Sequence, residues 1–282
     1  MGSYQLDDVL RAGAVVRAHA WYPWILGLFL LGAFTKSAQV PFLFWLPGAM
    51  AAPTPVSAYL HSATMVKAGI FLMARLWPAL SGTQEWFWIV AGAGACTLVL
   101  GAYAAMFQND LKGLLAYSTI SHLGLITLLL GLNRDLAAVA AVFHIMNHAV
   151  FKASLFMAAG IIDHETGTRD IRHLSGLGRR WPAFSTFFVL AAASMAGLPP
   201  FIGFVGKEAA FATVLEDPRL HGMPGPVITG VLVIGSVLTF AYSARLVMGA
   251  LRSKANHSFG RSPAVSSAHT PSLGFGSVPA IL

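Results

Sequence analysis

Two histidines and a lysine, His144, His148 and Lys152, recur at intervals of four residues within an apolar stretch. On an α-helix this spacing stacks the side chains along one face. The stretch 136–162 has no acidic residue and is long enough to cross a bilayer. Such residues can simply hydrogen-bond neighbouring helices, but ionisable groups are costly in hydrocarbon and usually have a function there. Three of them on one stripe favour a proton relay.

Four of the six lysines also fall inside membrane segments, namely Lys36, Lys67, Lys152 and Lys207. Each costs roughly 2.5–3.5 kcal/mol at the centre of a membrane helix on insertion scales. A lysine that is neutral in one state and charged in another can pass a proton along a wet chain. The competing interpretation is snorkelling of the amine to the interface, which suits the two lysines near expected helix breaks, Lys36 and Lys207.

Two further ionisable residues accompany these lysines. His61 lies six residues before Lys67, so the two do not share a helix face. Glu208 follows Lys207 directly and points about 100° away from it, so it is either a partner for another subunit or a cation, or a simple interfacial charge. The candidate proton path therefore consists of Lys36, His61, Lys67, His144, His148, Lys152, Lys207 and Glu208.

The composition indicates a membrane protein. Of 282 residues, 56% are hydrophobic and only 10% are charged, whereas a soluble domain carries about 25% charged residues. The net charge of +7 does not indicate nucleic-acid binding, because the arginines lie between apolar segments, where they set topology. We expect no cofactor, because nucleotide-binding loops are absent from the sequence. We expect no metal either, because Lys152 would repel a cation at the two histidines.

The apolar segments predict an all-α, polytopic membrane protein with about seven transmembrane helices, two of them interrupted. Residues 1–21 form a polar or interfacial lead-in, 22–252 the transmembrane domain and 253–282 a disordered Ser/Gly/Pro-rich tail. Prolines mark the two interruptions, at 41–50 and at 197–203. The predicted helices span about 22–38, 54–77, 85–107, 113–132, 136–162, 181–215 with its break, and 226–252.

Loop charge predicts the orientation. Eight lysines and arginines lie at one set of helix ends, including the charged segment 163–180, against four or five at the other. By the positive-inside rule, the segment 163–180 faces the cytoplasm and the N-terminus lies outside an inner or plasma membrane.

Several motifs resemble one family. Lys36-Ser37-Ala38-Gln39-Val40-Pro41, Pro53-Thr54-Pro55-Val56-Ser57-Ala58, and His61-Ser62-Ala63-Thr64-Met65 are similar to motifs of the antiporter-like subunits of respiratory complex I and of Mrp-type Na+/H+ antiporters. Asp110-Leu111-Lys112 before Leu115-Ala116-Tyr117-Ser118-Thr119 is another such signature. Within this family, Val66-Lys67-Ala68-Gly69 and the stretches 163–170 and 203–208 resemble the large A subunit of the Mrp antiporter.

The resemblance implies a membrane subunit that translocates protons in a multisubunit antiporter of Na+ or another monovalent cation, not an enzyme in itself. It also implies a fragment of the large A subunit, with an acidic partner for Lys36 on a preceding helix. The partners would be other membrane subunits, protons, the cation and the lipid bilayer, but not nucleic acid. Two alternatives remain open: a proton-pumping subunit of a complex I-like NADH-quinone oxidoreductase or hydrogenase, and a structural fragment that does not transport.

Overall fold

The computed structural model describes residues 5–62, 64–216, 222 and 224–253, and every regular element in these ranges is a helix. Within these ranges, four spans are long and apolar enough to cross a membrane. They are Gln84–Met106, which comprises α8 (Gln84–Trp86), the π-helix η3 (Phe87–Ala91) and α9 (Gly92–Met106), then α10 (Leu111–Gly131), α11 (Asp135–Thr166) and α15 (Pro224–Leu251). The predicted all-α membrane class is thereby confirmed.

Shorter helices form the rest of the described chain. The two predicted interruptions lie between such helices. Between α3 (Tyr22–Lys36) and residue 54, the chain forms only the short helix α4 (Trp45–Gly48) and the 3-10 turn η1 (Ala49–Ala51). The second interruption separates α13 (Pro182–Ala196) from α14 (Ile202–Leu215). Pro199 and Pro200 lie in this gap, where they remove two backbone donors from any continuing helix.

The prediction of one continuous helix over 54–77 is wrong. The structure divides it into α5 (Thr54–Ser62), the 3-10 turn η2 (Met65–Lys67) and α6 (Ala68–Arg75), with α7 (Trp77–Leu80) following. Thr64, with φ −118° and ψ −87°, leaves the helical region of backbone conformation. The break therefore puts Lys67 in a turn between two helices instead of on a regular helical face.

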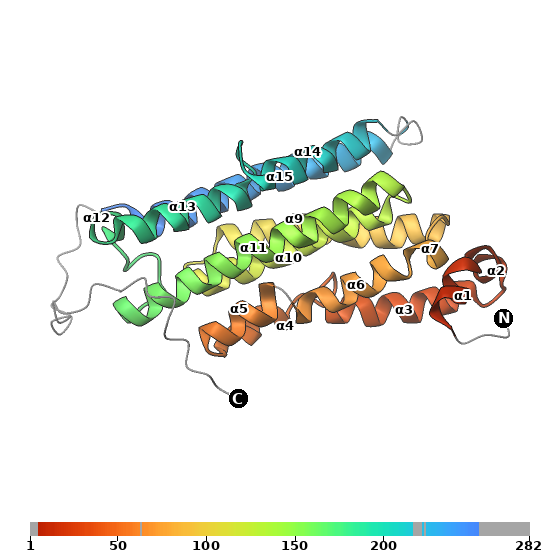
Figure 1. The fold of residues 1–282 in the computed structure, drawn as a ribbon, viewed down its shortest axis with the longest axis horizontal. Helices are drawn as coiled ribbons and strands as arrows, with labels where there is room; N and C mark the ends of the chain where they lie inside the picture. The colour runs from red at the N-terminus through yellow and green to blue at the C-terminus, as the bar shows by residue number, and fades with distance from the viewer. Residues whose placement is uncertain (1–4, 63, 217–221, 223, 254–282) are drawn as a thin grey trace.

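The helix α10 forms the centre of the bundle. It packs against α9, α11 and α15, and 89% of its most apolar window is buried (Figure 1). A helix that is apolar all round is expected to be buried on every side. Close approach to α9 depends on glycine: a Cβ at Gly94 would lie 2.3 Å from the Leu128 amide nitrogen, and one at Gly124 would lie 2.4 Å from that of Leu98. Small residues allow such contact between membrane helices.

Replacing Gly94 with valine is expected to destabilise this packing by about 1–3 kcal/mol, the usual range for overfilling a packed core. The matched control is Gly92→Val on the same helix, because a Cβ there meets nothing within 4 Å. Both variants lose glycine equally, so helix propensity cancels. Thermal unfolding of the purified protein should show a lower melting temperature for Gly94→Val alone, and equal melting temperatures would contradict the packing argument.

The two ends of the bundle differ in structure. At one end, α1 (Leu6–Arg11) and α2 (Gly13–Ala18) pack on α7, where Arg17 donates to the carbonyls of Pro78 and Ala79 at 3.0 and 3.1 Å. Both helices fall within the segment 1–21, for which the sequence predicts an interfacial lead-in. At the other end lie α12 (Leu177–Arg180) and the segment before it (Figure 1). The predicted tail lies, from residue 254 onward, outside the described residues.

The segment before α12 is tied to the α9–α10 turn. Leu111 donates its amide to Arg169 O at 2.9 Å, and Ile171 donates to Asn109 O at 2.8 Å. Asp170 is held by side-chain hydrogen bonds from Arg172, which lower the pKa of its carboxyl to about 2. This end is therefore an ordered, charged cap over α10 and α11.

Candidate functional site

The predicted stripe on α11 is present and faces α10. His144, His148 and Lys152 are all buried, with at most 1% of their surface exposed. The Lys152 amine donates to Leu115 O at 3.1 Å and to the Ser118 hydroxyl, both on α10. Because the i, i+4, i+8 spacing places these residues on one helix face, a single helix–helix contact buries them together.

A further histidine, His122 on α10, completes the cluster. Its Nδ1 lies 3.1 Å from Nε2 of His144, and the two rings stack with centroids 5.3 Å apart. The His148 ring lies 5.5 Å away, and the Tyr242 hydroxyl of α15 lies 3.2 Å from His122 Nε2. The sequence contained one signal for it, because His122 is an ionisable residue inside a membrane span.

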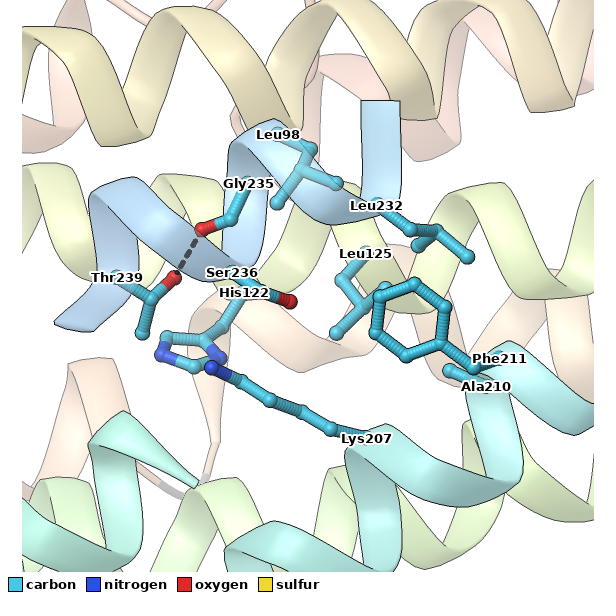
Figure 2. Close-up of a pocket in the computed structure, with 10 residues that line it drawn as sticks. All are labelled: Leu98, His122, Leu125, Lys207, Ala210, Phe211, Leu232, Gly235, Ser236 and Thr239. Carbon is cyan, nitrogen blue, oxygen red and sulfur yellow. Dashed lines mark hydrogen bonds between the residues drawn. The ribbon is translucent and has the colours of Figure 1, made fainter. Parts of the chain in front are cut away.

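Lys207 approaches the same histidine from α14. Its amine donates to Ala196 O, the last residue of α13, at 2.6 Å, so it spans the break between the two helices. A cavity of about 10 Å³ lies between α9, α10, α14 and α15 and is lined by Leu98, His122, Leu125, Lys207, Ala210, Phe211, Leu232, Gly235, Ser236 and Thr239. Figure 2 shows the Lys207 side chain extending toward the His122 ring in this cavity. The space is enough for about one water molecule.

Lys67 and His61 approach α11 from η2 and α5, earlier in the chain. Lys67 is 5% exposed and donates to Ile145 O of α11 at 3.0 Å. The buried ring of His61 lies 6.1 Å from that of Phe156, also on α11. Nδ1 of His61, Nδ1 of His144 and both ring nitrogens of His148 have no hydrogen-bond partner in the structure. They are therefore available to bind a proton or a water molecule.

Lys36 and Glu208 lie apart from this cluster. Lys36 ends α3 with its side chain exposed, and Glu208 is exposed on α14. The neighbour of Lys36, Ser37, turns inward instead and accepts a hydrogen bond from the Ile70 amide at 3.0 Å. Of the eight candidate residues, the structure brings six into or around the buried cluster and places these two on the outer surface of the described chain.

Neutral oxygens hold the buried amines. In the described part of the chain, Lys67, Lys152 and Lys207 form no salt bridge, and their partners are backbone carbonyls and the Ser118 hydroxyl. An amine held only by neutral oxygens can release its proton without leaving a buried carboxylate unpaired. The cluster thus combines amines, imidazoles and hydroxyls, which can all exchange protons, with a low-dielectric interior.

Comparison with known proteins identifies the family. The family described as NADH:quinone oxidoreductase/Mrp antiporter, transmembrane, matches residues 1–238. The chain belongs to this family. It is 60% identical over 264 residues to the A/B subunit of a probable K(+)/H(+) antiporter of Rhizobium meliloti, covering 94% of this chain and 26% of that protein. It is 50% identical over 259 residues to the A subunit of an Na(+)/H(+) antiporter of Alkalihalophilus pseudofirmus, covering 86% and 32%.

A solved structure gives the same result. A chain of the Mrp complex from Dietzia sp. superposes with a TM-score of 0.79 at 48% identity, covering 84% of this chain and 26% of that one. The predicted resemblance to the large A subunit of the Mrp antiporter is therefore confirmed. The prediction of a multi-pass membrane protein is confirmed with it. The chain spans about a quarter to a third of the length of these relatives.

Proposed function

We propose that this chain supplies a proton-translocating part of the membrane subunit of a multisubunit monovalent cation/proton antiporter. One observation carries the proposal: the buried contacts on both sides of His122, with His144 on one side and the cavity of Lys207 on the other. A structural fragment that only packs in the membrane would not need this array of titratable groups in its interior, because each is costly there.

The geometry supports proton transfer through the imidazoles. An imidazole binds a proton at one ring nitrogen and releases another from the second nitrogen, so it passes protons without moving. The 3.1 Å contact between His122 Nδ1 and His144 Nε2 is short enough for this transfer. On one side a single water in the cavity would link His122 to Lys207. On the other, the amine of Lys152 and the hydroxyl of Ser118 would continue the path between α11 and α10.

Orientation, cation and partners form part of the proposal. The arginines on and before α12 support a cytoplasmic position for segment 163–180 and an external N-terminus. The relatives named as K(+)/H(+) and Na(+)/H(+) antiporters support a monovalent cation as the exchanged ion. The likeness to a chain of the Mrp complex supports other membrane subunits as partners. Lys36 and Glu208 lie on surfaces that such partners can cover, so both remain in the proposed path.

The test is cation-dependent proton exchange by the complete complex that contains this chain. Everted membrane vesicles from cells that lack other antiporters are loaded with protons by respiration, and a pH-sensitive dye reports their release. Addition of Na+ or K+ should collapse the pH gradient only when this chain is present. Gradient collapse without the chain would contradict the proposal, as would a pH gradient that neither cation changes when the chain is present.

A further inference from the structure

A buried lysine outside the histidine cluster lies at the charged end of the bundle. Lys112 is in the first turn of α10, which Asp110 caps by accepting a hydrogen bond from the Gly113 amide at 2.9 Å. Only 2% of Lys112 is exposed. Its amine donates to Ala52 O, just before α5, at 2.9 Å. A snorkelling lysine at a helix end would point its amine into water instead.

On its outer side, Lys112 adjoins partly exposed carboxylates. Arg169 Nε lies 3.3 Å from the Asp110 carboxylate and 3.9 Å from that of Asp163, and these side chains are between 36% and 40% exposed. All three charges act on the Lys112 amine. They line an open surface pocket of about 580 Å³ together with Gly167, Thr168 and Asp170. Water therefore reaches the groups that surround Lys112.

Further into the bundle, α5 carries a buried histidine. His61 lies in the last turn of α5, the helix that begins just after Ala52. His61 is 1% exposed, and its Nδ1 has no hydrogen-bond partner. Its ring lies beside Phe156, one helical turn along α11 from Lys152. Lys112 is thus placed between the aqueous pocket and the buried groups.

We propose that protons pass between the aqueous pocket and His61 through the amine of Lys112. Asp110 and Asp163 would hold protons at the surface. In the inward step, a proton from the pocket binds the neutral amine and forms the ammonium. The ammonium then gives up one proton to intervening water, its N–H bond breaks, and the water passes a proton on so that an N–H bond forms at Nδ1 of His61. Lys112 returns to the neutral amine, so charge and protons balance. This inference rests on the proposed function and adds the connection of that path to water.

Three substitutions of Lys112 separate proton transfer from a purely structural role. Methionine keeps the side-chain length but has no amine, so exchange by the complete complex should fall roughly 10²-fold, a typical contribution of one acid–base group. Arginine keeps the charge and can donate to Ala52 O, but it does not release its proton, so it should be about as inactive as methionine. The Lys112→Cys complex should be inactive until an amine is attached to the cysteine.

The rescue experiment places the only cysteine of the chain at position 112, because Cys96 is the single cysteine of the sequence and can be replaced. In a Cys96→Ser background, Lys112→Cys complex is treated with aminoethyl methanethiosulfonate, which attaches an amine, or with methyl methanethiosulfonate, which does not. Exchange should return only with the aminoethyl reagent. Blue native electrophoresis confirms that each variant complex is assembled. The control is Arg179→Met, which removes an exposed basic residue at the same end.

The outcomes separate the two proposals. Full activity of Lys112→Arg, or equal rescue by both reagents, would show a structural role and overturn the inference. The same holds if Lys112→Met exchanges normally while Lys152→Met does not, a result that leaves the proposed function intact. If neither lysine matters for exchange, the proposed function fails as well.

Discussion

Replacing Lys152 with methionine is expected to reduce cation/proton exchange by the complete complex roughly 10²-fold or more, in the range for removal of one acid–base group. Lys152 is fully buried, and its amine bridges α11 to Leu115 O and the Ser118 hydroxyl of α10. Methionine fills nearly the same volume, so the helices should still pack. The measurement is the initial rate of pH-gradient collapse in everted vesicles after a cation pulse.

Two serines make matched controls for this prediction. Ser118→Ala removes the hydroxyl that contacts Lys152 and should slow exchange less than Lys152→Met does, because the amine stays. Ser154→Ala removes an exposed hydroxyl of α11 that donates only to Val150 O within its own helix, so exchange should be unchanged. Undiminished exchange by an assembled Lys152→Met complex would remove this lysine from the path.

The second large loss of exchange is expected at His122, and two different substitutions should produce it. His122→Leu removes the imidazole that contacts His144 and lines the cavity of Lys207. Exchange should fall roughly 10²-fold. Ala210→Leu instead fills the cavity of about 10 Å³ and leaves every titratable group in place. It should also block exchange, because no water could then link Lys207 to His122.

The cavity-filling variant needs a control for added bulk on α14. Val205→Leu adds a methylene at a position that is 51% exposed, so it should exchange protons at the normal rate. Both leucine variants must assemble to be compared, which co-purification of the partner subunits shows. If Ala210→Leu exchanges as well as Val205→Leu, the cavity does not carry the proton, and the path must leave His122 by the Tyr242 side.

Much of the site could be predicted from local sequence. The stripe of His144, His148 and Lys152 follows from helical periodicity alone, because residues four apart share a face whatever the partner helix. The break between α13 and α14 follows from Pro199 and Pro200, because proline lacks the amide that a continuing helix needs. Membrane class follows from composition, because long apolar segments with few charges are stable in a bilayer.

The tertiary structure decided which groups meet across helices. The contact of His122 with His144 and Tyr242 joins three helices, and the sequence of α10 alone does not say which helices its polar residues contact. The hydrogen bond of Lys112 to Ala52 O and the exposure of Lys36 are likewise set by neighbours distant in the chain. Periodicity reports only the rotation of a residue about its own helix axis. The rotation of one helix against another is set by packing, here by glycine contacts such as Gly94 against Leu128.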